Sequence, residues 1–212
     1  MRKDRRTISG FTLVELITSM AIGMIVLSAL YSVFIMQNRT LSTQEAIAEI
    51  QQTARIGMDI MLRDIRMAGY NPSKTTSWIS GTKPGLTNAT ADSLSFVSDL
   101  NADADTTAAE VNPEENVTYD RVDDGGISCL RRTVNGTGNS LVENMESLTF
   151  VYYDEAGNTL SLPASLSDVR KIQVTITAKT ALPDNAYVDP ILGDHYRRYS
   201  LTSQVTPRNL GL

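Results

Sequence analysis

A long apolar segment near the N-terminus constrains this chain more than any other feature. Between Phe11 and Met36, 26 consecutive residues contain a single charged residue, Glu15. As an α-helix the segment would span roughly 39 Å, which exceeds the ~30 Å hydrocarbon core of a bilayer. Four of the first six residues are basic, which predicts that residues 1–10 face the cytoplasm. Residues 11–36 are therefore predicted to form a membrane-spanning helix.

Two ordinary kinds of membrane segment compete for this stretch. A secretory signal peptide also has a basic start and an apolar run. The run here is about twice the usual signal length, and no small-residue cleavage site follows it. A signal anchor, which stays in the membrane uncut, fits the hydropathy equally well. Glu15 favours a more specialised segment, because an ionisable group inside a bilayer is costly unless it finds a partner.

Residues 37–70 continue as an amphipathic helix. Their apolar residues recur every three or four positions: Ile47, Ile50, Ala54, Met58, Met61, Ile65 and Ala68. This spacing is typical of a helix that packs one face against a protein body. No proline interrupts the segment before Pro72, which provides a stop signal. The sequence predicts one helix over residues 11–68, with Gly23 and Gly57 as the points where bending is easiest.

Residues 71–212 are expected to form a β-rich globular head. After a loop over residues 71–92, short alternating runs of branched and aromatic residues predict strands at 94–97, 117–119, 127–134, 148–153, 169–178 and 196–205. A turn at 155–158 is expected to pair 152–153 with 159–162 as a hairpin. Because only strands follow the helix, the sheet should be mainly antiparallel, with its apolar face on the helix. The predicted fold class is α+β.

Composition excludes several functions. The net charge of −5 argues against a nucleic-acid-binding protein, which needs a basic face. With one cysteine, Cys129, and one histidine, His195, the chain forms no internal disulfide and no multi-histidine metal site. Cys129 is expected to be a small buried residue, and His195 to lie at a strand edge. No phosphate-binding loop, nucleophile elbow or dinucleotide fingerprint is present, so we do not expect an enzyme.

One acidic segment resembles the beginning of a calcium-binding loop. Asn101, Asp103 and Asp105 place side-chain oxygens at alternate positions. The pattern then departs from an EF-hand, because Thr106 stands where glycine is needed and Asn112 where a bidentate glutamate is expected. We expect a solvated acidic loop and no cofactor, with calcium at these three residues as the alternative.

The sequence around Glu15 identifies the specialised segment. Gly10-Phe11-Thr12-Leu13-Val14-Glu15, preceded by a short basic leader, resembles the type III signal of type IV prepilins. The resemblance implies that prepilin peptidase removes residues 1–10 by cutting between Gly10 and Phe11, and that the new amine of Phe11 is N-methylated. It also implies that Glu15 pairs with the terminal amine of a neighbouring subunit. In apolar surroundings each charge alone is costly, whereas together they fix a register. A glutamate that merely reaches the headgroups is the alternative.

Two further motifs refine the resemblance. Residues 63–70 (RDIRMAGY) and 205–210 (VTPRNL) resemble those of PilW-type minor pilins. This implies a pilin fold, an inner-membrane location with the head in the periplasm, and later export in the pilus. The implied partners are other minor and major pilins, prepilin peptidase, the inner-membrane assembly platform and a tip adhesin. The implied function is pilus assembly in an initiation or tip complex. Two alternatives stay open, a J-type minor pseudopilin of type II secretion and a membrane-anchored extracytoplasmic binding or adhesion module.

Overall fold

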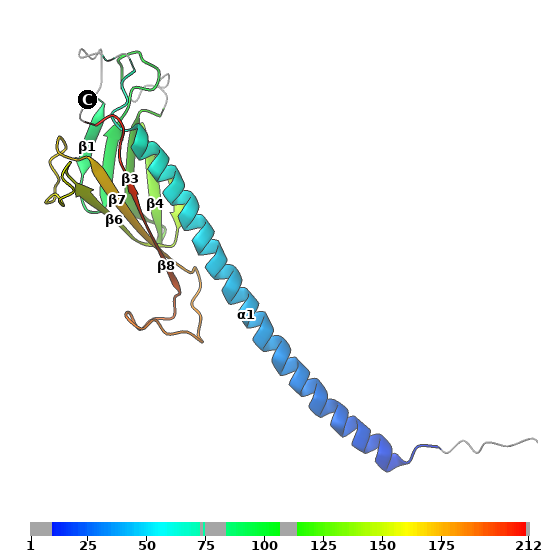
Figure 1. The fold of residues 1–212 in the computed structure, drawn as a ribbon. Coiled ribbons are helices and arrows are strands. Elements are labelled where there is room, and N and C mark those ends of the chain that lie inside the picture. Colours follow the sequence, from blue (N-terminus) through cyan, green and yellow to red (C-terminus); the bar gives the residue numbers. More distant parts are fainter. Residues whose placement is uncertain (1–9, 73, 75–83, 107–113, 211–212) are drawn as a thin grey trace, which may run out of the picture. The chain divides into compact units, whose positions relative to one another are not determined.

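The computed structural model describes residues 10–72, 74, 84–106 and 114–210. Within these residues, one helix is followed by eight strands (Figure 1). The chain divides into two compact units, Met1–Glu45 and Ala46–Leu212. Of the leader predicted at residues 1–10, only Gly10 is described, and much of the loop predicted at 71–92 also lies outside the described residues.

Helix α1 runs from Leu13 to Met67 without interruption, as the absence of proline predicted. It ends at Gly69, whose φ of 78° lies in the left-handed region that favours glycine at a helix terminus. The Gly69 amide donates to the carbonyl of Val97 at 3.0 Å. A Cβ at Gly69 would also stand 3.0 Å from the Asn209 carbonyl oxygen, so the close approach of the C-terminal segment requires glycine here too.

The strands form two antiparallel sheets, where the sequence analysis expected one. The first has the order β1-β2-β3-β4-β5 and the second the order β6-β7-β8. The strand bounds are β1 Gly85–Ala89, β2 Ser93–Val97, β3 Asn116–Asp124, β4 Ile127–Val134, β5 Thr137–Glu143, β6 Met145–Tyr153, β7 Lys171–Lys179 and β8 Arg198–Val205. The prediction was right for six strands and missed β1 and β5. The α+β class, with one long helix and antiparallel strands, is confirmed.

The predicted hairpin after β6 forms only in part. Tyr153 and Thr159 make an isolated antiparallel bridge, and the Leu160 amide donates to the Tyr152 carbonyl at 2.8 Å. The turn between them is fixed by Asp154, whose carboxylate accepts from the amide and the side chain of Asn158. These hydrogen bonds lower the pKa of Asp154. The returning segment is too irregular to be a strand.

The core joins the predicted helical stripe to both sheets. The helix buries Ile50, Ala54, Met58, Met61 and Ile65, and β7 alternates buried and partly exposed residues along its whole length. A polar contact adds to this packing. Asp64 on α1 accepts from the hydroxyl of Tyr119 on β3 at 2.6 Å and from Nε of Arg132 on β4 at 2.7 Å. Burial, followed by the negative charge of Asp64, raises the pKa of Tyr119, so the phenol stays a hydrogen-bond donor.

Gly57 has a role that the sequence analysis did not assign to it. A Cβ built on Gly57 would lie 2.4 Å from Cγ2 of Val142 on β5 and 3.4 Å from Cδ2 of Leu130 on β4. Both partners are buried, branched side chains with little room to retreat. Gly57 therefore allows the helix to approach the five-stranded sheet closely, whereas the sequence analysis had considered it only as a point of bending.

Candidate functional site

The predicted cleavage point lies just before the helix. Gly10 and Phe11 precede α1, and the Phe11 side chain is 90% exposed. A Cβ at Gly10 would meet no atom within 4 Å. A non-helical, unobstructed peptide bond is the form of backbone that a peptidase can bind in extended conformation. The geometry at Gly10 and Phe11 therefore suits proteolysis.

Thr12 and Glu15 form a reciprocal cap at the start of α1. The Glu15 carboxylate accepts from the Thr12 amide and from the Thr12 hydroxyl, both at 2.9 Å. In return, the Glu15 amide donates to the Thr12 hydroxyl at 3.3 Å. This is a capping box, in which two otherwise unpaired helix-terminal donors are satisfied. The role of Thr12 was not predicted, although the Thr-x-x-Glu spacing is the known signal for this cap.

The helix after this cap presents apolar side chains all around. None of the most apolar 18-residue window of α1 is buried. Three hydroxyl groups in the segment are paired within the helix: Thr18, Ser19 and Ser32 each donate to a main-chain carbonyl three or four residues earlier. Such internal pairing is what a bilayer interior demands of polar side chains. By length and composition, this part of α1 can cross a membrane.

The acidic loop after β2 links the three calcium candidates by hydrogen bonds within the loop. The Asn101 side chain accepts from the Asp103 amide at 3.1 Å, and Asp103 accepts from the Asp105 amide at 2.8 Å and from the Asn101 side-chain amide at 2.8 Å. Two intervening residues, Ala102 and Ala104, have positive φ angles of 67° and 61°. These hydrogen bonds and turns shape the loop, and they occupy side-chain oxygens of Asn101 and Asp103.

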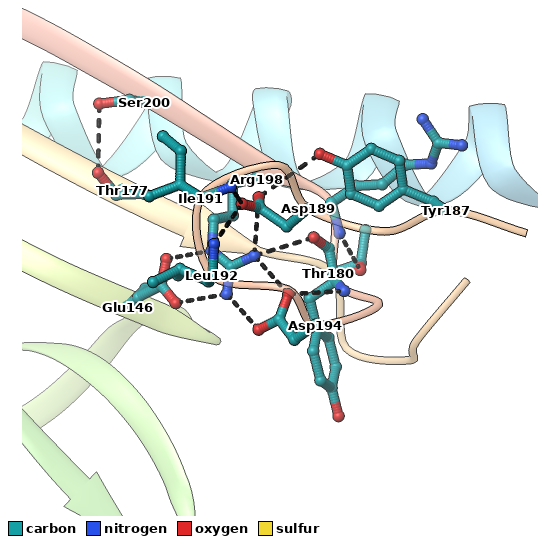
Figure 2. Close-up of polar contacts among 12 residues, drawn as sticks. Glu146, Thr177, Thr180, Tyr187, Asp189, Ile191, Leu192, Asp194, Arg198 and Ser200 are labelled. Carbon is teal, nitrogen blue, oxygen red and sulfur yellow. Dashed lines mark hydrogen bonds and ion pairs between the residues drawn. The ribbon is translucent and has the colours of Figure 1, made fainter. Parts of the chain in front are cut away.

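A second polar cluster holds the segment between β7 and β8 (Figure 2). Arg198 at the start of β8 donates to Glu146 on β6 at 2.6 and 2.8 Å, to Asp194 at 2.5 and 2.7 Å, and to Asp189 at 3.1 Å. Asp189 also accepts from the amides of Ile191 and Leu192. The guanidinium thus ties residues 180–197 to two strands, and sequence reasoning missed it because Glu146 is far from Arg198 along the chain.

Residues 180–197 carry exposed apolar side chains on this fixed framework. Ile191 is 89% exposed, and Leu182, Val188 and Leu192 are also exposed. His195 lies in the same segment, exposed, with Nδ1 against the Tyr187 carbonyl. His195 was predicted at a strand edge but lies in the loop, three residues before β8 begins. Cys129 on β4 is buried, as predicted.

We expect the contribution of Arg198 to head stability to depend on acidic pH. Hydrogen bonds from Arg198 are the largest cause of a fall in the Asp194 pKa from 3.8 to about 2. A carboxylate whose pKa is lowered on folding stabilises the fold above its unfolded pKa, and this stabilisation disappears as pH falls through the folded value. Arg198→Met should therefore lower the thermal midpoint by several degrees at pH 7, and the deficit should shrink between about pH 4 and pH 2. Thermal unfolding of the wild type and the variant, followed by circular dichroism at each pH, measures this difference in midpoint. A difference that stayed constant between about pH 4 and pH 2 would contradict the ion-pair explanation.

Comparisons with known proteins bear on the N-terminal segment. The family model described as the prokaryotic N-terminal methylation motif matches residues 5–31. No curated protein sequence matches the chain significantly. Among solved structures, a type IV-like pilin from Thermus thermophilus is similar, with a TM-score of 0.47, 11% identity and coverage of 76% of this chain and 98% of that one. Residues 5–31, which include the predicted cleavage point, Thr12 and Glu15, therefore match the prokaryotic N-terminal methylation motif, and the helix that begins within them is long and apolar enough to cross a membrane.

Proposed function

We propose that the chain is a minor pilin, which enters a type IV pilus through its N-terminal helix and acts in the initiation or tip complex. The observation that carries this proposal is the coincidence of two features in residues 5–31. The methylation motif matches there, and the same residues begin a helix whose apolar side chains are exposed all around. A soluble protein would bury such a surface. The role is structural rather than enzymatic.

Processing is the first step of the proposal. Prepilin peptidase cuts between Gly10 and Phe11 on the cytoplasmic side of the inner membrane, and the new amine of Phe11 is methylated. The basic residues before the cut favour this orientation, because positive charge is retained in the cytoplasm. The head, residues 71–212, then lies in the periplasm until the subunit joins a fibre.

Assembly is the second step, and it depends on Glu15. In the isolated subunit the Glu15 carboxylate caps its own helix through Thr12. A cap of this kind keeps the charge hydrogen-bonded but leaves it without a cation. The terminal amine of Phe11 on an adjoining subunit supplies that cation, and an ion pair in apolar surroundings favours one axial register over others. The capping box therefore holds the carboxylate until a neighbouring subunit arrives.

The likeness to PilW-type minor pilins gains support from the position of its two motifs. Residues 63–70 and 205–210 meet at the end of α1, where the Arg208 amide donates to the Arg66 carbonyl at 3.4 Å. Gly69 in the first motif faces the carbonyl of Asn209 in the second. Two motifs far apart in sequence thus form one local structure. The proposed partners of the chain are other minor pilins, the major pilin, the inner-membrane platform and a tip adhesin.

A matched pair of glycine substitutions tests the processing step. We expect Gly10→Val to block cleavage, because a branched side chain obstructs the backbone at the scissile bond and Gly10 has no neighbours that would make the change disruptive to folding. The measurement is the intact mass of the protein from membranes: wild type should lack residues 1–10 and carry one added methyl group, whereas the variant should retain its full length.

Gly23→Val is the control for that experiment, since Gly23 also has no neighbours within 4 Å of a built Cβ. It should be processed as the wild type is. If wild-type protein isolated from membranes retained residues 1–10, the proposal would be overturned and a membrane-anchored binding module would be supported. If processing occurs, a deletion strain separates the remaining alternatives, because loss of pili indicates a minor pilin and loss of protein secretion indicates a minor pseudopilin.

A further inference from the structure

Two buried acidic residues meet at one end of the five-stranded sheet. Asp99 lies shortly after β2 and Glu115 directly before β3, and both residues are 0% exposed. The Ser98 amide donates to the Glu115 carbonyl at 2.9 Å, which extends the pairing of the two strands beyond their regular ends. The Leu100 amide, directly after Asp99, donates to the Glu115 carboxylate, so the Glu115 side chain lies beside Asp99 although the two residues are 16 positions apart in the sequence.

Each carboxylate has a hydrogen-bond partner on one oxygen only. Asp99 Oδ1 accepts from the Ala102 amide at 2.7 Å, and Glu115 Oε1 accepts from the Leu100 amide at 2.9 Å. Asp99 Oδ2 and Glu115 Oε2 are buried, and within the part of the chain that the structure describes neither has a hydrogen-bond partner. Buried polar atoms are paired in the great majority of cases, and an unpaired carboxylate oxygen is among the costliest exceptions.

The charge of this pair is also uncompensated. None of the salt bridges among the described residues involves Asp99 or Glu115. The pKa of Glu115 is raised, and burial is the largest cause. Hydrogen bonds from main-chain amides oppose this rise, whereas the negative charges of Asp103 and Asp99 add to it. Such a pair is stabilised either by a proton on one carboxylate or by a cation to which both free oxygens bind.

The chemistry of the surroundings favours a hard cation. The loop offers carboxylate, amide, hydroxyl and main-chain oxygens, and it contains neither Cys129 nor His195. Calcium takes six to eight such oxygens and accepts waters among them. Among the described residues no three histidine, cysteine, aspartate or glutamate side chains are grouped to hold a metal, so the charged ligands number two. Calcium sites with few charged ligands bind weakly, and we expect a dissociation constant of about 10⁻⁴–10⁻³ M, as in extracellular modules.

We propose that Asp99 and Glu115 form a calcium site, in which the ion bridges Asp99 Oδ2 and Glu115 Oε2 and neutral oxygens and water complete its shell. The site differs from the one suggested by Asn101, Asp103 and Asp105, because its ligands are the two buried carboxylates. It fastens the segment after β2 to the start of β3. The inference concerns the head alone and is independent of pilus assembly.

Calcium titration of the full chain in detergent tests this site. At a calcium concentration about 100 times the dissociation constant, the thermal midpoint of the head should rise by about 5–10 °C relative to the protein in EDTA. Isothermal titration calorimetry should show one site. Magnesium at equal concentration should give a much smaller shift, because it demands stricter octahedral geometry. Identical midpoints in calcium and EDTA, or equal shifts with calcium and magnesium, would overturn the proposal.

Variants locate the ion. Asp99→Asn and Glu115→Gln keep the shape of each side chain and remove its charge, so they relieve the repulsion and should fold. Each should lower the calcium affinity at least about tenfold, and together they should abolish the midpoint shift. Asp123→Asn, at an exposed position on β3, is the matched control and should behave as the wild type. A calcium shift that persists in the double variant would place the ion elsewhere and refute the assignment, and the wild-type titration decides the matter if a variant fails to fold.

Discussion

Replacing Glu15 with alanine should reduce incorporation of the subunit into pili by at least about a hundredfold. The proposed ion pair between Glu15 and the amine of a neighbouring Phe11 lies in apolar surroundings, where removal of one partner costs about 3–5 kcal/mol, and each 1.4 kcal/mol is about tenfold in an equilibrium. The variant should still be cleaved and methylated, because Gly10 and Phe11 are unchanged. The measurement is the amount of subunit in sheared pili relative to the amount in membranes.

Glu15→Gln separates the two roles of this side chain. Glutamine can still complete the capping box with Thr12, but it carries no charge. We expect Glu15→Gln to be nearly as defective as Glu15→Ala if charge pairing drives assembly. If Glu15→Gln assembled normally while Glu15→Ala failed, the carboxylate would matter only as a helix cap, and the pairing step would be wrong. Glu15→Asp, which keeps the charge on a shorter side chain, should retain partial incorporation.

Gly57→Leu should destabilise the head by about 1–2 kcal/mol. A Cβ at this position already stands 2.4 Å from Val142, and overpacking a filled core costs about 1–3 kcal/mol, occasionally more. Leucine has a helix propensity roughly 0.8 kcal/mol better than glycine, which offsets only part of the clash. The helix must move away from β5, which weakens its contacts with the sheet. Thermal or urea unfolding of the full chain in detergent, followed by circular dichroism, measures the loss.

Ala48→Leu is the matched control for Gly57→Leu. Ala48 lies on the same helix at an exposed position, so leucine there adds similar bulk without meeting the sheet. Exposed substitutions of this kind usually change stability by less than about 0.5 kcal/mol. Equal effects of the two variants would show that the close contact at Gly57 does not determine the stability of the head.

Local patterns predicted the helix and the most regular strands. The apolar stripe and the stop at Pro72 gave the bounds of α1 to within two residues, because a 3.6-residue period persists over many turns. β4 was predicted with its observed bounds, Ile127–Val134, and β7 to within two residues. In β7 the buried and exposed residues alternate, which is the strongest sequence signal that a strand can have.

The missed elements lack such a signal. β5, with the sequence TGNSLVE, is almost wholly exposed at a sheet edge, so no alternation of apolar residues reveals it. β1 lies in a segment rich in turn residues. Both become strands because a neighbouring strand offers hydrogen-bond partners, a tertiary effect that overrides local preference.

The same limit applies to the functional residues. Gly10, Phe11 and Glu15 are recognisable because they are adjacent in the sequence and share one motif. Thr12 could have been found from its spacing to Glu15. By contrast, Asp99 and Glu115 meet only through the pairing of β2 with β3, and no local pattern distinguishes them from the other acidic residues of the chain.

Gly69 lies against the Asn209 carbonyl, so the end of α1 is held next to residues near the end of the described chain. Separating α1 from the sheets would also break this contact and the hydrogen bond from the Gly69 amide to the Val97 carbonyl. A chain shortened after Val205 would lack one side of this contact, so residues 206–210 help to fasten the end of α1 to the head.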